Sequence, residues 1–143
     1  MSTQTNKAIA RRVFEEVFNA GNLNLLDELA SADVVVHYGG ADPVRGLETY
    51  KRAFTASQPT FPDMHFTIED MIAEGDRVVT RWTMRATHRG EHLGVAATGR
   101  QVTETGISIY RIVGGKVVEG WVSSDDLGVM QQLGALPAPA HAG

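Results

Sequence analysis

The chain has 143 residues, a length typical of a single domain, and 43% of them are hydrophobic, which is enough to form a buried core. A formal net charge of -4 disfavours a protein that binds nucleic acid, and the absence of cysteine excludes disulfides, thiolate metal sites and cysteine nucleophiles. No apolar run approaches the roughly 20 residues of a membrane span, and the first residues lack the apolar middle of a secretory signal, so we expect a cytoplasmic protein that binds no membrane.

The first 60 residues carry mostly helical patterns. Apolar residues recur at helical spacing over residues 6–20 and predict a helix there, and a shorter leucine-rich helix follows. The β-branched run 34–36 predicts a brief strand that leads to His37. After the turn at 42–43 a third helix is predicted, which ends before the first proline beyond it and carries the apolar side chains Leu47, Tyr50 and Phe54.

The second half of the sequence carries strand patterns. From Met64 onward the apolar period changes to two, and polar or glycine-rich turns separate the segments. Gly114-Gly115 is the clearest turn, because a two-residue hairpin loop requires positive φ at both positions. A last short helix over 127–133 precedes an Ala/Pro-rich tail, residues 135–143, that we expect to be flexible. The predicted strands are 64–73, 77–88, 100–113 and 116–124.

This order of elements predicts an α+β fold in which a curved antiparallel sheet wraps around the N-terminal helices. We expect one cone-shaped domain over residues 1–134, with a cavity between the first helix, the third helix and the sheet. Such a cavity suits a small hydrophobic substrate, and Tyr50 and Phe54 are expected to contact it.

Several stretches give the sequence a resemblance to the SnoaL-like polyketide cyclases, which belong to the nuclear transport factor 2-like cone superfamily. The resemblance implies a cyclase-like enzyme that closes a ring by an intramolecular aldol reaction, with acid-base catalysis and no cofactor. It also implies a homodimer that forms through the outer face of the sheet. The matching stretches are residues 18–22, 43–46, 74–79, 106–111, 114–121 and 131–134.

The resemblance also places the family's catalytic positions. The family's aspartate generally follows the position of Trp121, where this sequence has Val122, and the helper positions fall on Phe18 and Ala53. We expect Phe18, Trp121 and Val122 to contact the substrate. The same pocket could instead serve a hydratase, dehydratase, isomerase, epoxide hydrolase or hydroxylase, or a protein that binds a small ligand without converting it.

Four ionisable residues are candidates for the chemistry. His37 ends an apolar strand, and imidazole titrates near neutral pH, which favours proton transfer; the alternative is a histidine bonded to the backbone. Asp125 and Asp126 follow the last strand and could be a catalytic carboxyl at the cavity mouth, the N-cap of the last helix, or one of each. Arg81 could bind a substrate carbonyl or carboxylate, or lie paired on the outside.

The register of the last hairpin decides which side chains line the cavity. Regular pairing across Gly114-Gly115 sets Glu104 opposite Asp125 on a polar face, and predicts that Ile107 and Ile109 on the other face are core. We expect the polar face to point outward. If it lines the cavity instead, Glu104 and Asp125 form a carboxylate pair that could share a proton, and a bulge would exchange the two faces.

No cofactor or metal is expected. The sequence has no glycine-rich phosphate loop and no nucleotide-binding fingerprint. His88 and His92 flank Gly90 in a predicted turn, so the helical spacing of metal ligands does not apply to them.

Overall fold

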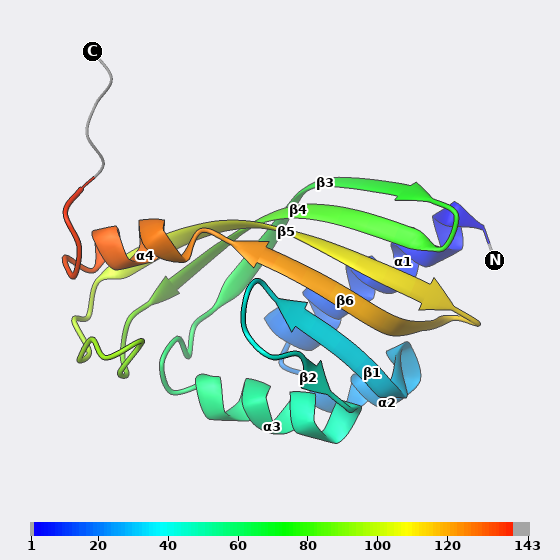
Figure 1. The fold of residues 1–143 in the computed structure, drawn as a ribbon, viewed down its shortest axis with the longest axis horizontal. Helices are drawn as coiled ribbons and strands as arrows, with labels where there is room; N and C mark the ends of the chain where they lie inside the picture. Colours follow the sequence, from blue (N-terminus) through cyan, green and yellow to red (C-terminus); the bar gives the residue numbers. More distant parts are fainter. Residues whose placement is uncertain (1, 139–143) are drawn as a thin grey trace, which may run out of the picture.

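The computed structural model describes residues 2–138, which form a curved six-stranded sheet with helices packed against its concave face (Figure 1). The strand order is β2-β1-β6-β5-β4-β3, and every pairing is antiparallel except that of β1 with β6. The α+β cone predicted from the sequence is therefore confirmed. The strands are β1 (Ala30–Tyr38), β2 (Val44–Arg45), β3 (His65–Glu74), β4 (Arg77–Thr87), β5 (Gln101–Val113) and β6 (Lys116–Ser124).

The first helix begins earlier than its apolar stripe predicts. The hydroxyl of Ser2 accepts a hydrogen bond of 3.0 Å from the backbone N–H of Thr5, so the helix starts at a capping residue that lies before the first apolar position. It continues as π-helical turns to Asn19, whose side-chain amide bonds both backbone groups of Phe66 on β3 at 2.8 and 2.7 Å. These bonds fasten the helix to the sheet. The helical segments are α1 (Thr3–Arg12), the π-helical Val13–Asn19, the 3-10 turn Leu23–Leu25, α2 (Leu26–Leu29), α3 (Leu47–Ser57) and α4 (Asp126–Gln132).

A β-bulge sets the faces of the last hairpin. Ile112 pairs with Val117, but the next pair is Arg111 with Glu119, so Val118 is an extra residue on β6. Beyond the bulge every pairing differs by one from that of a regular hairpin, and the prediction of regular pairing is wrong there. The faces of β5 are consequently exchanged relative to those of β6, and its polar residues share a face with Val122.

This exchange moves the polar residues of β5 inward. Ser108 and Tyr110 are buried on the concave face, whereas Ile107, predicted to be core, is 47% exposed on the convex face. The prediction of an outward polar face is thus wrong for β5, because the bulge at Val118 and not the Gly114-Gly115 turn alone fixes the register.

The sequence did not predict the two-residue strand β2, because a segment this short carries no periodicity. The tail predicted for residues 135–143 lies outside the described residues from position 139 onward. Within residues 2–138, no helix combines the length and the apolar character that a membrane crossing requires.

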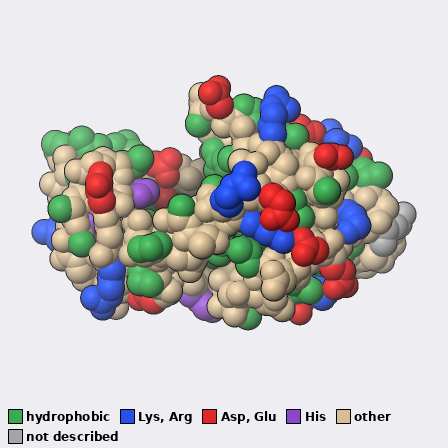
Figure 2. Space-filling model, turned by 90° about the horizontal axis from the view of Figure 1, so that it is seen from below, with side chains coloured by type: hydrophobic (Ala, Val, Ile, Leu, Met, Phe, Trp, Pro, Cys, Tyr) green, Lys and Arg blue, Asp and Glu red, His purple; other side chains and the backbone are tan. Residues whose placement is uncertain are grey.

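The side of the molecule below the sheet of Figure 1 carries both signs of charge. Figure 2 shows Lys and Arg side chains interleaved with Asp and Glu on this side. Some of the oppositely charged side chains of the molecule are paired: Arg12 bonds Glu16 at 2.8 Å and reaches Glu28 at 3.3 Å. No single-sign patch dominates the view, as expected for a chain of small net charge.

Candidate active site

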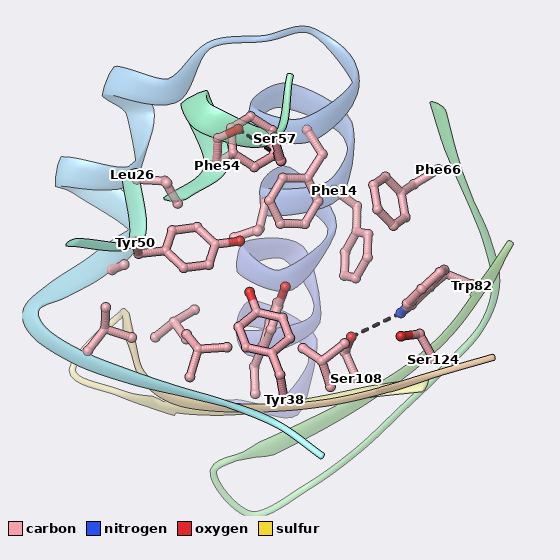
Figure 3. Close-up of a pocket in the computed structure, with 18 of the residues that line it drawn as sticks. Phe14, Leu26, Tyr38, Tyr50, Phe54, Ser57, Phe66, Trp82, Ser108 and Ser124 are labelled. Atoms are coloured by element: carbon pink, nitrogen blue, oxygen red, sulfur yellow. Dashed lines mark hydrogen bonds between the residues drawn. The ribbon is translucent and has the colours of Figure 1, made fainter. Parts of the chain in front are cut away.

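A cavity of about 220 Å³ lies between the first helix, α3 and the concave face of the sheet. Its walls are mainly apolar, and the close-up shows aromatic rings from the helices facing those from the sheet (Figure 3). Four of the predicted substrate-binding residues line it, namely Phe18, Tyr50, Phe54 and Val122. The structure therefore brings these four side chains together around one space.

The aromatic wall depends on a glycine in the middle of β5. The indole N–H of Trp82 donates a hydrogen bond of 2.9 Å to the hydroxyl of Ser108 (Figure 3). A Cβ atom on Gly106 would lie 2.2 Å from the ring of Trp82, so only glycine lets the indole lie across β5 at this point. Phe66 meets the same ring edge-on, with centroids 5.0 Å apart. The rigid ring shapes one end of the cavity.

Glu104 supplies an ionisable group within this apolar space. It extends from the concave face of β5 and lines the cavity together with Ser124 of β6. Burial of the carboxyl, with the nearby carboxyls of Asp126 and Asp125, raises the pKa of Glu104 to about 7. At neutral pH the protonated and ionised forms are therefore both populated, which is the condition that acid-base catalysis requires.

The two aspartates after β6 have different surroundings. Asp125 is the N-cap of α4, because its carboxylate accepts a hydrogen bond of 2.9 Å from the backbone N–H of Gly128. Asp126 accepts a bond of 3.2 Å from the hydroxyl of Ser124 and acts electrostatically on Glu104. The cap expected among the alternatives is thus Asp125, whereas Asp126 is coupled to the carboxyl in the cavity.

Three other predicted site residues lie on the convex face, away from the cavity. His37 Nε2 is 2.8 Å from Glu119 Oε2, and its ring stacks on Trp121 with centroids 5.4 Å apart. Arg81 bonds Asp70 on the neighbouring strand at 2.7 Å. The structure does not bring these side chains to the cavity. The catalytic role predicted for His37, and the binding roles of Trp121 and Arg81, remain predictions, and so do the homodimer and the cytoplasmic location.

The sequence analysis named Glu104 only under the alternative in which the polar face of the hairpin lines the cavity. The bulge at Val118 was the missing information, and no turn signal marks it in the sequence. Glycines inside the strands offered a partial signal, because Gly106 and Gly120 interrupt two runs of β-forming residues. Both glycines lie on the concave face, where side chains from adjacent strands approach them closely.

The comparison with known families decides the identity of the fold. The family model described as SnoaL-like polyketide cyclase matches residues 8–133. The chain belongs to the SnoaL-like polyketide cyclase family. Among curated proteins, no sequence matches it at a significant level.

Solved structures of the SnoaL-like family superimpose closely on the chain. IdmH of Streptomyces antibioticus, described as a "putative polyketide cyclase", is 35% identical, with a TM-score of 0.81 over 90% of this chain and 98% of its own. AclR of Streptomyces galilaeus, described as a "putative hydroxylase", is 29% identical, with a TM-score of 0.85 over 97% of this chain and 87% of its own. A SnoaL-like protein of Jannaschia is 26% identical, with a TM-score of 0.85 over 94% and 95% of the two chains.

The position of the catalytic aspartate separates this SnoaL-like chain from the pattern that its resemblance implied. Val122 lines the cavity where a catalytic aspartate was implied, and its isopropyl group cannot transfer a proton. Glu104 lines the same cavity from the adjacent strand. The ionisable carboxyl of this chain thus enters the space from β5.

Proposed function

We propose that this SnoaL-like protein is an enzyme that needs no cofactor and acts by acid-base catalysis on a small hydrophobic carbonyl compound. The observation that supports it is the carboxyl of Glu104 in an apolar cavity, with a pKa of about 7. A carboxyl in such surroundings can accept a proton at neutral pH and return it later in the same cycle.

The reaction fits an aldol-type ring closure. The ionised Glu104 carboxylate removes a proton from the carbon next to a substrate carbonyl, which leaves an enolate and a neutral carboxyl. The enolate carbon attacks a second carbonyl of the same substrate, so one carbon–carbon bond forms and an alkoxide results. The carboxyl of Glu104 then donates its proton to the alkoxide, which restores the starting state of the enzyme. The apolar walls exclude water from the enolate.

The first step can be tested without knowing the natural substrate. The probe is 2-tetralone in D2O, and proton NMR follows the exchange of the hydrogens next to its carbonyl. We expect the protein to accelerate exchange, with a rate that rises through a pH of about 7 and then levels off as Glu104 ionises. The Glu104→Gln variant should lose roughly 10²-fold or more of this rate, a typical general-base contribution.

Glu119→Gln is the matched control, because it makes the same change on the convex face of the adjacent strand. It should retain the exchange rate of the unmodified protein. Equal rates for Glu104→Gln and the unmodified protein would contradict the assignment of Glu104. Failure of the folded protein to accelerate exchange would contradict the enzyme hypothesis and favour a protein that only binds its ligand.

The likeness to AclR favours hydroxylation of a similar hydrophobic compound as a second candidate function. The two candidates differ in the mass of the product. Ring closure by an aldol addition leaves the mass unchanged. Hydroxylation adds one oxygen atom from molecular oxygen, and an electron donor in the assay reduces the second oxygen atom to water. Mass spectrometry of polycyclic ketones incubated with the protein distinguishes them.

A further inference from the structure

All three tyrosines of the sequence line the same cavity. Tyr38 comes from the end of β1, Tyr50 from α3 and Tyr110 from β5, so three elements that are distant in the sequence contribute one phenol each. The rings of Tyr38 and Tyr50 point into the same part of the cavity (Figure 3). We call these three side chains the tyrosine cluster.

A second strand glycine makes this arrangement feasible. Tyr110 pairs with Gly120 across β5 and β6, and a Cβ atom on Gly120 would lie 3.3 Å from the ring of Tyr110. Without a side chain at this position, the ring of Tyr110 lies over β6. The ring of Phe14 stacks on it at 5.9 Å and holds it there.

The hydroxyls of the cluster act as neutral donors. Burial, with the nearby hydroxyls of Tyr38 and Tyr110, raises the pKa of Tyr50 well above its usual value, and burial likewise raises the pKa of Tyr110. Three hydroxyls carry three hydrogens, and the hydrogen bond between Tyr38 and Tyr50 uses one of them. The other hydroxyl hydrogens can be donated to a ligand in the cavity.

The charges around the cavity select the kind of acceptor. Among the described residues that line it, Glu104 is the only one with an ionisable acid or base other than the tyrosines. A ligand carboxylate would be buried there without a cation, which is costly. A neutral ketone oxygen, or an enolate whose charge is delocalised, can accept hydrogen bonds from the tyrosine hydroxyls without the cost of burying a localised charge.

We propose that the tyrosine cluster binds the carbonyl oxygen of an elongated hydrophobic ketone and stabilises the corresponding enolate. The inference rests on the proposed function for the kind of ligand. Tyr110 and Glu104 are on the same face of β5, six positions apart, which corresponds to roughly 20 Å between their Cα atoms. The oxygen bound by the cluster therefore belongs to a second carbonyl, at the other end of the ligand from the carbon that loses a proton to Glu104. Conjugation between the two carbonyls transmits the stabilisation of the enolate.

Binding measurements test this inference independently of catalysis. The probes are the ketone 1-tetralone, the hydrocarbon tetralin and the carboxylate 1-naphthoate, titrated by calorimetry. We expect the ketone to bind about 10-fold tighter than the hydrocarbon, the difference that one hydrogen bond to a buried donor supplies, and the carboxylate to bind more weakly than the ketone. The infrared C=O stretch of bound 1-tetralone should lie below its value in an apolar solvent.

Tyr50→Phe and Tyr110→Phe should each remove most of the preference for the ketone and shift the C=O stretch back. Tyr38→Phe, which changes the most exposed ring of the three, provides a further variant if a deeper change impairs folding. Ser123→Ala removes an exposed hydroxyl on the convex face of β6, where Ser123 pairs with Ile107, and should keep the preference. Equal affinity for ketone and hydrocarbon, or a preference retained in all three tyrosine variants, would overturn the inference.

The outcomes separate the two proposals. If Glu104→Gln loses hydrogen exchange while the tyrosine variants keep the ketone preference, Glu104 remains the catalytic group and the cluster has no role in recognition. If the ketone preference depends on the tyrosines while Glu104→Gln exchanges normally, the cluster is a ligand site and the proposed catalysis is wrong.

Discussion

Two glutamates on adjacent strands show that the two faces of this sheet shift the pKa of the same side chain in opposite directions. Glu104 on β5 faces the cavity, where burial raises its pKa to about 7. Glu119 on β6 faces outward, where hydrogen bonding to His37 and then to Arg111 lowers its pKa. The convex face holds the denser group of charged side chains, but their charges are paired and in contact with water. Desolvation, and not the density of ionisable groups, identifies the better candidate for proton transfer.

The largest expected effect concerns the packing of the concave face. Gly106→Ala places a methyl group 2.2 Å from the ring of Trp82, so the indole must move or β5 must shift. We expect the free energy of unfolding to fall by about 3 kcal/mol, at the upper end of overpacking effects. Guanidinium denaturation measures the change. Gly40→Ala is the control, because nothing lies within 4 Å of the added atom, and an unchanged stability of Gly106→Ala would refute the packing described here.

The second prediction compares the two glutamates through the pH dependence of stability. The pKa of Glu104 is higher in the folded protein than in the unfolded chain, so its contribution to stability is greatest at low pH and declines as the pH rises from about 4.5 to about 7. Glu104→Gln removes this decline. Relative to the unmodified protein, the free energy of unfolding of the variant should rise by about 2 kcal/mol between pH 4 and pH 8. Each unit of pKa change corresponds to about 1.4 kcal/mol, and the partial exposure of Glu104 reduces the total effect.

Glu119→Gln should change the pH dependence of stability in the opposite direction in the same experiment. Its pKa is lowered by folding, so its stabilising contribution is present above a pH of about 4.5 and disappears as the pH falls through the lowered value. Thermal unfolding measured across this range distinguishes the two variants. If stability changed with pH in the same way in both variants, the contrast between the pKa values of the two glutamates would be contradicted.

The smallest expected effect concerns His37. The largest cause of the lowered pKa of Glu119 is its hydrogen bond with His37, so His37→Ala should raise that pKa toward its usual value. Carboxyl NMR titration measures the change, and Arg111→Ala should produce a smaller one. A large loss of exchange activity in His37→Ala would support the catalytic role predicted from the sequence and contradict the placement of the chemistry in the cavity.

The sequence predicted the architecture well because its signals are local. Apolar periods of four and then two, together with Gly114-Gly115, were sufficient to predict the helices and the hairpins. The cavity lining from Phe18, Tyr50 and Phe54 followed from the same periodicity and the resemblance. These predictions required no knowledge of how one strand aligns with the next.

The faces of the strands were not predictable in the same way. One extra residue at Val118 exchanges the faces of β5 relative to those of β6 over the rest of the hairpin, and no local motif in the sequence marks the bulge. Glu104 and Tyr110 therefore line the cavity, although we expected their face to point outward. Tyr38 was missed for a related reason, because a strand expected to end at His37 continues by one residue.

The parallel pairing of β1 with β6 has a consequence for how the molecule is made. Val36 lies beside Gly120 in the finished sheet, so the strand that carries Tyr38 has no neighbour on that side until almost the whole polypeptide has left the ribosome. During synthesis the N-terminal helices can form, but the pocket cannot close around them. A nascent chain halted before Lys116 would expose the edge of β1 and be prone to association with other chains, so the cavity is the last feature of this fold to form.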